Sequence, residues 1–249
     1  LTPENIEREH ICCAMADKKS LAGMTAKKVW LGCRMAEGLK FIKGDERGKV
    51  FIEYLPAEKA WVPLDQQTVE GYIYVNCFWV SGSFKGKGYG KALLATCEAD
   101  ARQQGKKGII FTVGKKKLPY LTDKKFLEKQ GYRISDQTTI GFELLVRKFD
   151  DAAPDPKFAA SARTGKLEGS HHAGIDIFYT AQGPFTVPYI GLIGPAVEKA
   201  NKEGIPIRIH PLESLEKAQQ HAVPVTTYSV FVDGVFRTHE ILTEVKLNK

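Results

Sequence analysis

Cysteine is absent from the second half of the sequence, and this absence limits the chemistry of that half. The chain has 249 residues and five cysteines, which are Cys12, Cys13, Cys33, Cys77 and Cys97. No two of them show the C-x-x-C spacing of zinc sites and redox pairs, so we predict buried free thiols and neither disulfides nor a zinc site. Thiol–disulfide exchange needs a thiolate and a resolving thiol, and the residues after Cys97 supply neither.

Long apolar runs are also missing. No stretch approaches the roughly 20 residues that cross a bilayer, and no signal-peptide pattern opens the chain, so we predict a cytoplasmic protein without membrane contact. The net charge of +7 favours anionic ligands. The lysines are not interleaved with aromatic residues, so no specific nucleic-acid partner is predicted. The adjacent His171 and His172 are expected to be solvated, and no metal site is predicted.

The most informative stretch covers residues 72–104. Its apolar and aromatic start, 72–80, predicts a buried strand. A loop rich in glycine and lysine follows, and a helix is then predicted with Leu93, Leu94, Cys97 and Ala101 on one face. Glycines let backbone N–H groups approach a ligand, and the helix start adds free N–H donors and partial positive charge. This arrangement predicts a site for phosphate or pyrophosphate.

The glycine spacing excludes two common phosphate loops. Gly86, Gly88 and Gly90 do not give the G-x-x-x-x-G-K-[ST] spacing of a Walker loop. They also fail the G-x-G-x-x-G fingerprint, because Lys91 and Leu93 occupy the last position in the two possible alignments.

The pattern resembles the pyrophosphate loop of the GNAT acetyltransferases. Lys85-x-x-Gly88-x-Gly90 is similar to their Arg/Gln-x-x-Gly-x-Gly/Ala signature, with Lys in the first place, and the flanking strand and helix match as well. The resemblance implies an α/β (α+β) fold with a mixed, mainly antiparallel sheet, and direct transfer of an acetyl group from acetyl-CoA to an amine of a small molecule or peptide. It also implies a set of residues that bind acetyl-CoA through backbone and side chain: Phe78, Trp79, Val80, Lys85, Gly86, Lys87, Gly88, Tyr89, Gly90 and Lys91.

The resemblance covers about residues 2–149, so we predict a GNAT domain over 1–150. A helix is expected from Thr2 onward and another over 27–38, with Val29, Trp30, Cys33 and Leu39 in the core. The family's first strand precedes that first helix, so we expect it to be missing from this sequence. Strands are expected at 39–43, 50–54, 109–113, 132–135 and 140–149, with a turn over 44–48 and a short helix at 122–129.

Residues 151–172 lack periodicity and predict an interdomain linker or a long covering loop. A second domain is expected over 173–249, with the element order βαβαββ and a hairpin turn at Asp233-Gly234. The order, the segment around Pro224 and the helix proline Pro195 resemble thioredoxin, in which the proline corresponding to Pro224 is cis. The redox cysteines are missing, because Gly183-Pro184-Phe185-Thr186 stands in their place. The combination resembles the YoaP-like acetyltransferases.

The sequence offers several candidates for the catalytic groups. The tyrosine that usually acts as acid in the GNAT family is replaced by Leu127. We predict Glu53, Tyr74, Cys77 and Tyr120 as candidate catalytic residues, since acetyl transfer needs a proton acceptor and a donor.

Further candidates near the expected cleft are Tyr54, Tyr72 and Glu143. Core packing for the Tyr and Cys side chains, a solvated strand face for the Glu side chains, and proton transfer to water are the alternatives. A different class, a non-catalytic CoA-binding or peptide-binding adaptor, stays open. A monomer or homodimer is expected, and the sequence does not identify the acceptor amine.

Overall fold

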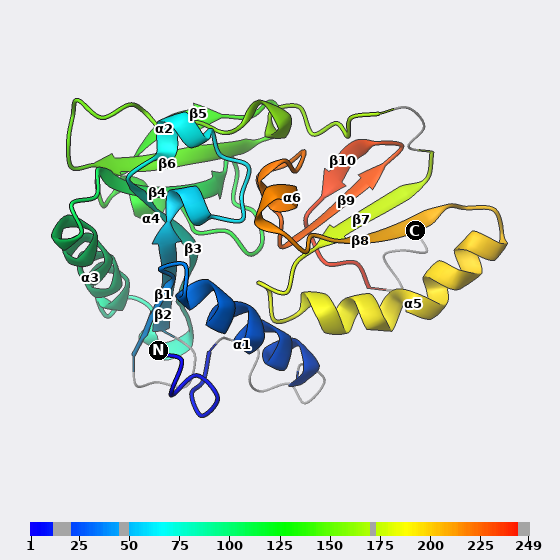
Figure 1. Ribbon diagram of the computed structural model, residues 1–249, viewed down its shortest axis with the longest axis horizontal. Helices are drawn as coiled ribbons and strands as arrows, with labels where there is room; N and C mark the ends of the chain where they lie inside the picture. The colour runs from blue at the N-terminus through cyan, green and yellow to red at the C-terminus, as the bar shows by residue number, and fades with distance from the viewer. Residues whose placement is uncertain (12–20, 45–49, 170–172, 244–249) are drawn as a thin grey trace.

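Two β-sheets lie side by side in the computed structural model, which describes residues 1–11, 21–44, 50–169 and 173–243 (Figure 1). The predictions made for Cys12, Cys13, His171, His172 and the turn after Gly44 lie outside these described residues.

The elements are as follows. The first half contains α1 (Leu21–Met35), β1 (Lys40–Lys43), β2 (Val50–Pro56), α2 (Gln66–Val69), β3 (Tyr72–Val80), α3 (Tyr89–Gln103), β4 (Gly108–Gly114), α4 (Lys124–Glu128), β5 (Arg133–Gln137) and β6 (Phe142–Lys148). The second half contains β7 (Ile175–Tyr179), α5 (Thr186–Lys202), β8 (Ile207–Pro211), α6 (Leu215–Gln219), β9 (Tyr228–Val232) and β10 (Val235–Thr238).

The first sheet is mixed and mainly antiparallel, as predicted. Its strand order is β1-β2-β3-β4-β6-β5, and only β3 and β4 run parallel. Helix α3 packs on one face of this sheet, away from the second sheet (Figure 1). Its buried residues are Leu93, Leu94, Cys97 and Ala101, which confirms the predicted helical face.

Strand β3 contains a bulge at its centre. Glu53 of β2 lies opposite Cys77, whereas the next residue, Tyr54, lies opposite Val75, so Asn76 is the extra residue. Before the bulge, Tyr72 and Tyr74 face away from α3. After it, Cys77 packs on that same side, while Phe78 joins the cluster under α3.

The second sheet has the order β10-β9-β7-β8, with β7 and β8 parallel and the other neighbours antiparallel. The expected element order βαβαββ is therefore found. Helix α5, which contains Pro195, covers one face through Ile193 and Val197. The described residues contain no cis peptide bond, so Pro224 differs from the cis proline that the thioredoxin resemblance implied. The likeness of this half to thioredoxin stays a prediction.

The segment expected to be a linker or a covering loop is packed along both halves. Phe158 is buried and forms an isolated antiparallel β-bridge with Leu64 of the first half. Further along, Lys166 forms an isolated antiparallel β-bridge with Val235 of β10. The segment therefore packs over the junction between the two sheets. Its place as a domain boundary stays a prediction.

Two expectations for the start of the chain were wrong. Residues 3–9 form hydrogen-bonded turns and no helix, since only Ile6 to Thr2 and Glu9 to Asn5 make i→i−4 bonds. In α1, Val29 is 62% exposed and Cys33 is also exposed. The buried face of α1 is instead formed by Gly23, Lys27, Trp30 and Leu31.

Candidate active site

The loop between β3 and α3 has the backbone form of an anion site. Gly86 and Gly88 have positive φ angles of 76° and 85°, and a Cβ at either position would meet no atom within 4 Å. Gly88 is the N-cap of α3, whose first turn holds no acidic residue. The open helix start and the exposed lysines around it attract negative charge. These lysines are Lys85, Lys87 and Lys91.

Directly before this loop, β3 separates from β4. The two strands are paired only at Tyr72, Ile73 and Tyr74 of β3, and no described residue beyond Tyr74 is in register with β4. Strand β3 continues to Val80 against β2, and β4 continues to Gly114 against β6. The opened edge leaves backbone N–H and C=O groups of β3 for a ligand. The predicted CoA-contacting residues Phe78, Trp79 and Val80 lie on this part of β3.

A cavity of about 160 Å³ lies at this opening, between the two halves of the chain. The first half contributes β3, β4 and the loop before α4, and the second half contributes the loop before α5 and the segment before β9. Its described lining comprises Lys27, Phe51, Val62, Tyr74, Asn76, Cys77, Trp79, Thr112, Tyr120, Leu121, Gln182, Gly183, Pro184, Phe185, Thr186, Pro224, Val225, Thr226, Thr227, His239 and Ile241.

Three of the four predicted catalytic residues line this cavity together. Tyr74, Cys77 and Tyr120 come from two segments of the first half. The Tyr74 hydroxyl donates to Thr112 Oγ1 at 3.0 Å, and burial raises the Tyr74 pKa to about 12. Tyr120 lies in the left-handed region with φ of 63° and is 66% exposed. Tyr74 is therefore a protonated phenol at neutral pH, next to the opening of the sheet.

Glu53, the fourth predicted residue, lies behind the cavity wall and is buried, so a solvated strand face is excluded for it. Its carboxylate accepts from Lys27 Nζ at 2.8 Å and from Asn76 Nδ2 at 3.0 Å. Lys27 also donates to the Gln182 carbonyl at 2.8 Å. An ion pair of the first half thus holds the loop before α5 in place. The sequence did not reveal this role, because a lysine on a helix is normally solvated.

The remaining candidates are bonded away from the cavity. The Tyr54 hydroxyl donates to Asp100, and burial raises its pKa. The Tyr72 hydroxyl donates to the Pro154 carbonyl. Glu143 is buried and paired with Lys124, so it too has no solvated face. Leu127, where the family's tyrosine was expected, is buried in the core under α3.

Sequence reasoning missed His239, which lines the same cavity. Its Nε2 lies 2.9 Å from the Pro119 carbonyl oxygen, which can only accept, so Nε2 carries the hydrogen and Nδ1 keeps a lone pair. Burial lowers the pKa of His239, so the imidazole is neutral at pH 7. No local motif marks His239; only the packing of the second half against the loop before α4 brings it there.

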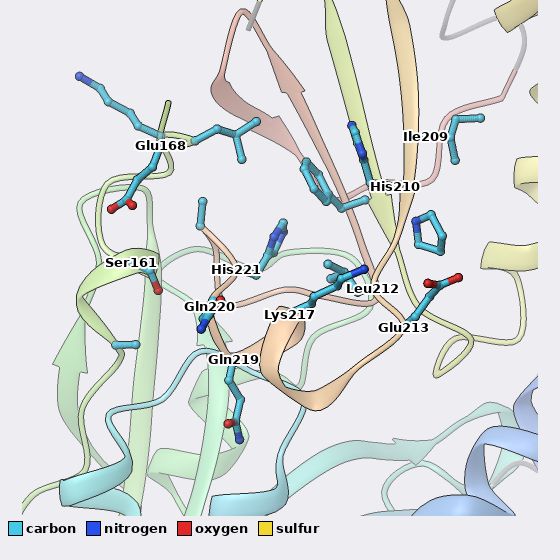
Figure 2. Close-up of a pocket in the computed structure, with 16 residues that line it drawn as sticks. Ser161, Glu168, Ile209, His210, Leu212, Glu213, Lys217, Gln219, Gln220 and His221 are labelled. Atoms are coloured by element: carbon cyan, nitrogen blue, oxygen red, sulfur yellow. The ribbon is translucent and has the colours of Figure 1, made fainter. Parts of the chain in front are cut away.

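A second, larger hollow of about 780 Å³ lies outside this site (Figure 2). His210, Lys217 and His221 surround it in Figure 2, between β8, α6 and the segment around Ser161. His210 connects this hollow to Asp176, whose carboxylate lies 2.7 Å from His210 Nε2 and accepts from Arg208, and Arg208 lowers the Asp176 pKa. None of its described lining residues belongs to the loop between β3 and α3 or to β3.

Comparison with known proteins now identifies the family. The Acetyltransferase (GNAT) family model matches residues 6–132, and a YoaP-like model matches residues 206–249. The chain belongs to the GNAT acetyltransferase family. Over its full length it is 43% identical to a Bacillus subtilis (strain 168) protein named uncharacterized N-acetyltransferase YoaP, of which it covers 96%.

Solved structures of GNAT proteins are more distant. The PaiA N-acetyltransferase of Thermoplasma acidophilum, in complex with coenzyme A, is 16% identical with a TM-score of 0.40, covering 60% of this chain and 96% of that one. A GNAT acetyltransferase of Brucella melitensis, in complex with acetyl-CoA, is 17% identical with a TM-score of 0.37, covering 64% and 90%.

The described residues also bear on membranes and metals. None of the helices there has the length and apolar character needed to span a membrane. Among the same residues, no group of His, Cys, Asp and Glu side chains is arranged to hold a metal ion.

Proposed function

We propose that this GNAT protein transfers an acetyl group from acetyl-CoA to an amine bound in the cavity between the two halves. The observation that carries the proposal is the continuity of three features along one segment. These are the opened edge of β3, the cavity beside it and the phosphate loop that follows it. Such a segment can hold an extended thioester ligand at both ends and place its reactive carbon against the cavity.

In this proposal each part of the ligand meets a different part of the chain. The backbone N–H groups of the loop and the side chains of Lys85, Lys87 and Lys91 bind the pyrophosphate. The backbone of Phe78 and Val80 pairs with the pantetheine arm. The thioester then lies close to Cys77, where the bulge opens onto the cavity.

Acetyl transfer to a protonated amine requires one proton to leave the nitrogen before the attack and one after it, and one proton to reach the departing thiolate. His239 accepts the first, because it is neutral and carries a free Nδ1 lone pair on the cavity wall. The neutral nitrogen then attacks the thioester carbonyl and a C–N bond forms; as the C–S bond breaks, the nitrogen loses its surplus proton to water. Tyr74 supplies a proton to the thiolate. Glu53 acts through Lys27 and Asn76 as a positioning residue, and Tyr120 closes the outer wall.

Calorimetric titration with acetyl-CoA, followed by thiol release with a panel of amines, tests the proposal. Gly88→Trp fills the loop and should abolish tight binding. Gly105→Trp is the matched control, since Gly105 follows the other end of α3 with a similar φ of 66° and equally open surroundings. Equal binding by both variants would refute the assignment of the loop. Acetyl-CoA binding without thiol release by any amine would favour the adaptor hypothesis.

Two substitutions test the proton carriers. His239→Gln should lower kcat and change KM much less. It should also remove the acidic limb of the pH profile of kcat/KM, because that limb reports protonation of the base. Tyr74→Phe should lower kcat alone. A His239→Gln profile with the same acidic limb as the unmodified protein would exclude His239 as the base.

A further inference from the structure

The cavity between the two halves has a composition that points to the chemistry of the acceptor. Resting on the proposed function, we infer that the acceptor is an amine with a single positive charge and an apolar substituent about the size of an aromatic ring. Two independent properties of the cavity support this class, namely the charge of its wall and the apolar surface that it offers.

The described wall of the cavity contains no aspartate or glutamate. Its one lysine, Lys27, is ion-paired with Glu53 at 2.8 Å, and His239 is neutral at pH 7. The wall is therefore close to electrical neutrality. An acceptor amine that gives up its proton leaves no charge behind, whereas a second ammonium group would lose hydration without a carboxylate to pair with. Polyamines and aminoglycosides, which carry several ammonium groups, do not match this wall.

Apolar side chains from both halves line the same space. The first half contributes Phe51, Leu121 and Trp79, and Trp79 is 38% exposed. The second half contributes Phe185 and Val225. An apolar substituent that covers this surface gains the free energy of apolar burial, and aromatic rings add edge and face contacts.

The size of the cavity limits the substituent. Its volume of about 160 Å³ is close to that of a cavity of roughly 150 Å³, which holds one benzene molecule. A ring joined to the amine by a short chain therefore fits, with the nitrogen toward Cys77 and Tyr74. The second half thus sets the acceptor class, because it supplies the loop before α5 and the segment before β9.

Two matched pairs of amines separate the two arguments. 1-Butylamine and 1,4-diaminobutane differ in the second ammonium group, and ethylamine and 2-phenylethylamine differ in the ring. At saturating acetyl-CoA we expect kcat/KM to be at least about tenfold higher for 1-butylamine and for 2-phenylethylamine within their pairs. A diamine used equally well or better, or a ring that gives no advantage, would overturn the inference while leaving acetyl transfer intact. No turnover with any amine, despite acetyl-CoA binding, would overturn the proposed function and the inference with it.

A negative charge placed in the cavity should shift the acceptor preference from 2-phenylethylamine toward 1,4-diaminobutane. Phe185→Glu puts a carboxylate at the entrance of α5, so kcat/KM should fall about tenfold or more for 2-phenylethylamine and rise for 1,4-diaminobutane. Leu192→Glu is the control, because Leu192 lies on the same helix, is 59% exposed and does not line the cavity. Its ratio between the two amines should equal that of the unmodified protein. An unchanged ratio in Phe185→Glu would contradict the inference, and if that variant does not fold, the amine pairs decide.

Discussion

The buried ion pair of Lys27 and Glu53 gives the sharpest test of how the two halves are joined. Lys27→Met removes the positive charge and the donor to the Gln182 carbonyl, while Glu53 keeps only its bond from Asn76. The two side chains are 4% and 0% exposed, so the rule for buried pairs applies. An uncompensated buried charge costs about 3–5 kcal/mol of unfolding free energy.

A double variant separates the charge from the packing. Lys27→Met combined with Glu53→Gln leaves two neutral side chains, so the penalty of an uncompensated buried charge disappears and the lost donor to the Gln182 carbonyl is the main remaining cost. We therefore expect the double variant to recover most of the loss. The matched control is Arg133→Met, which breaks the pair with Asp155 at 2.6 Å, where the side chains are 52% and 41% exposed. That surface pair should contribute about 0–1 kcal/mol.

The assay is urea unfolding followed by fluorescence of Trp30, Trp61 and Trp79, analysed as a double-mutant cycle. A loss below about 1 kcal/mol for Lys27→Met would refute the reasoning, because it would place the pair in the surface class. A double variant as unstable as the sum of the two single variants would also refute it, because the charges would then be uncoupled.

Three further predictions concern single residues. Gly23→Ala should destabilise the protein by about 1–3 kcal/mol in urea unfolding, because its Cβ would lie 1.8 Å from the Pro184 backbone oxygen. Gly88→Ala and Gly105→Ala should each cost about 1–2 kcal/mol in the same assay, since both have positive φ and open surroundings. Burial lowers the pKa of His221 to about 3 in the folded protein. Below about pH 6.5 the unfolded chain therefore binds a proton that the folded protein does not, and the free energy of unfolding decreases by about 1.4 kcal/mol per pH unit as the pH falls toward 3. His221→Gln should flatten that slope in urea unfolding between pH 6.5 and 4.5.

Each of these has a clear contrary result. A stable Gly23→Ala variant would show that α1 and the loop before α5 can separate at small cost. A much larger loss of unfolding free energy in Gly88→Ala than in Gly105→Ala would contradict the open surroundings of Gly88, because the added methyl group would then have to clash with another atom. An unchanged pH slope in His221→Gln would mean that other groups dominate the acid response.

Local patterns predicted the parts of the site that depend on one segment. The bounds of β3 and the buried face of α3 follow from apolar residues at strand and helix spacing, and both were found as predicted. The glycine- and lysine-rich loop between β3 and α3 was equally local, because all its glycines and lysines lie within residues 82–91, and its binding of a phosphate group stays a prediction. Tyr74 and Cys77 lie on β3 itself, so their approach to the opening followed from the same strand.

Features that depend on packing between segments were not predictable in this way. Lys27 occupies a core position of α1, whereas Val29, the more apolar residue, is exposed. His239 and Phe185 reach the cavity only because the second half is packed against the first. The separation between such residues exceeds 100 positions in the chain, as for Lys27 and Gln182, and no periodicity links them.

The bulge at Asn76 changes which alternate positions of β3 face each side of the sheet. Even-numbered positions face away from α3 before it, at Tyr72 and Tyr74, and odd-numbered positions do so after it, at Cys77 and Trp79, so that Tyr74, Cys77 and Trp79 line the cavity. Deleting Asn76 would leave Val75 opposite Tyr54 and Cys77 opposite Glu53 in plain alternation, so Cys77 would still face away from α3 and Phe78 would still face it, and the strand would lose the bulge and the Asn76 bond to Glu53. The bulge therefore accommodates one extra residue in β3 without changing which side chains face the cavity and which face α3.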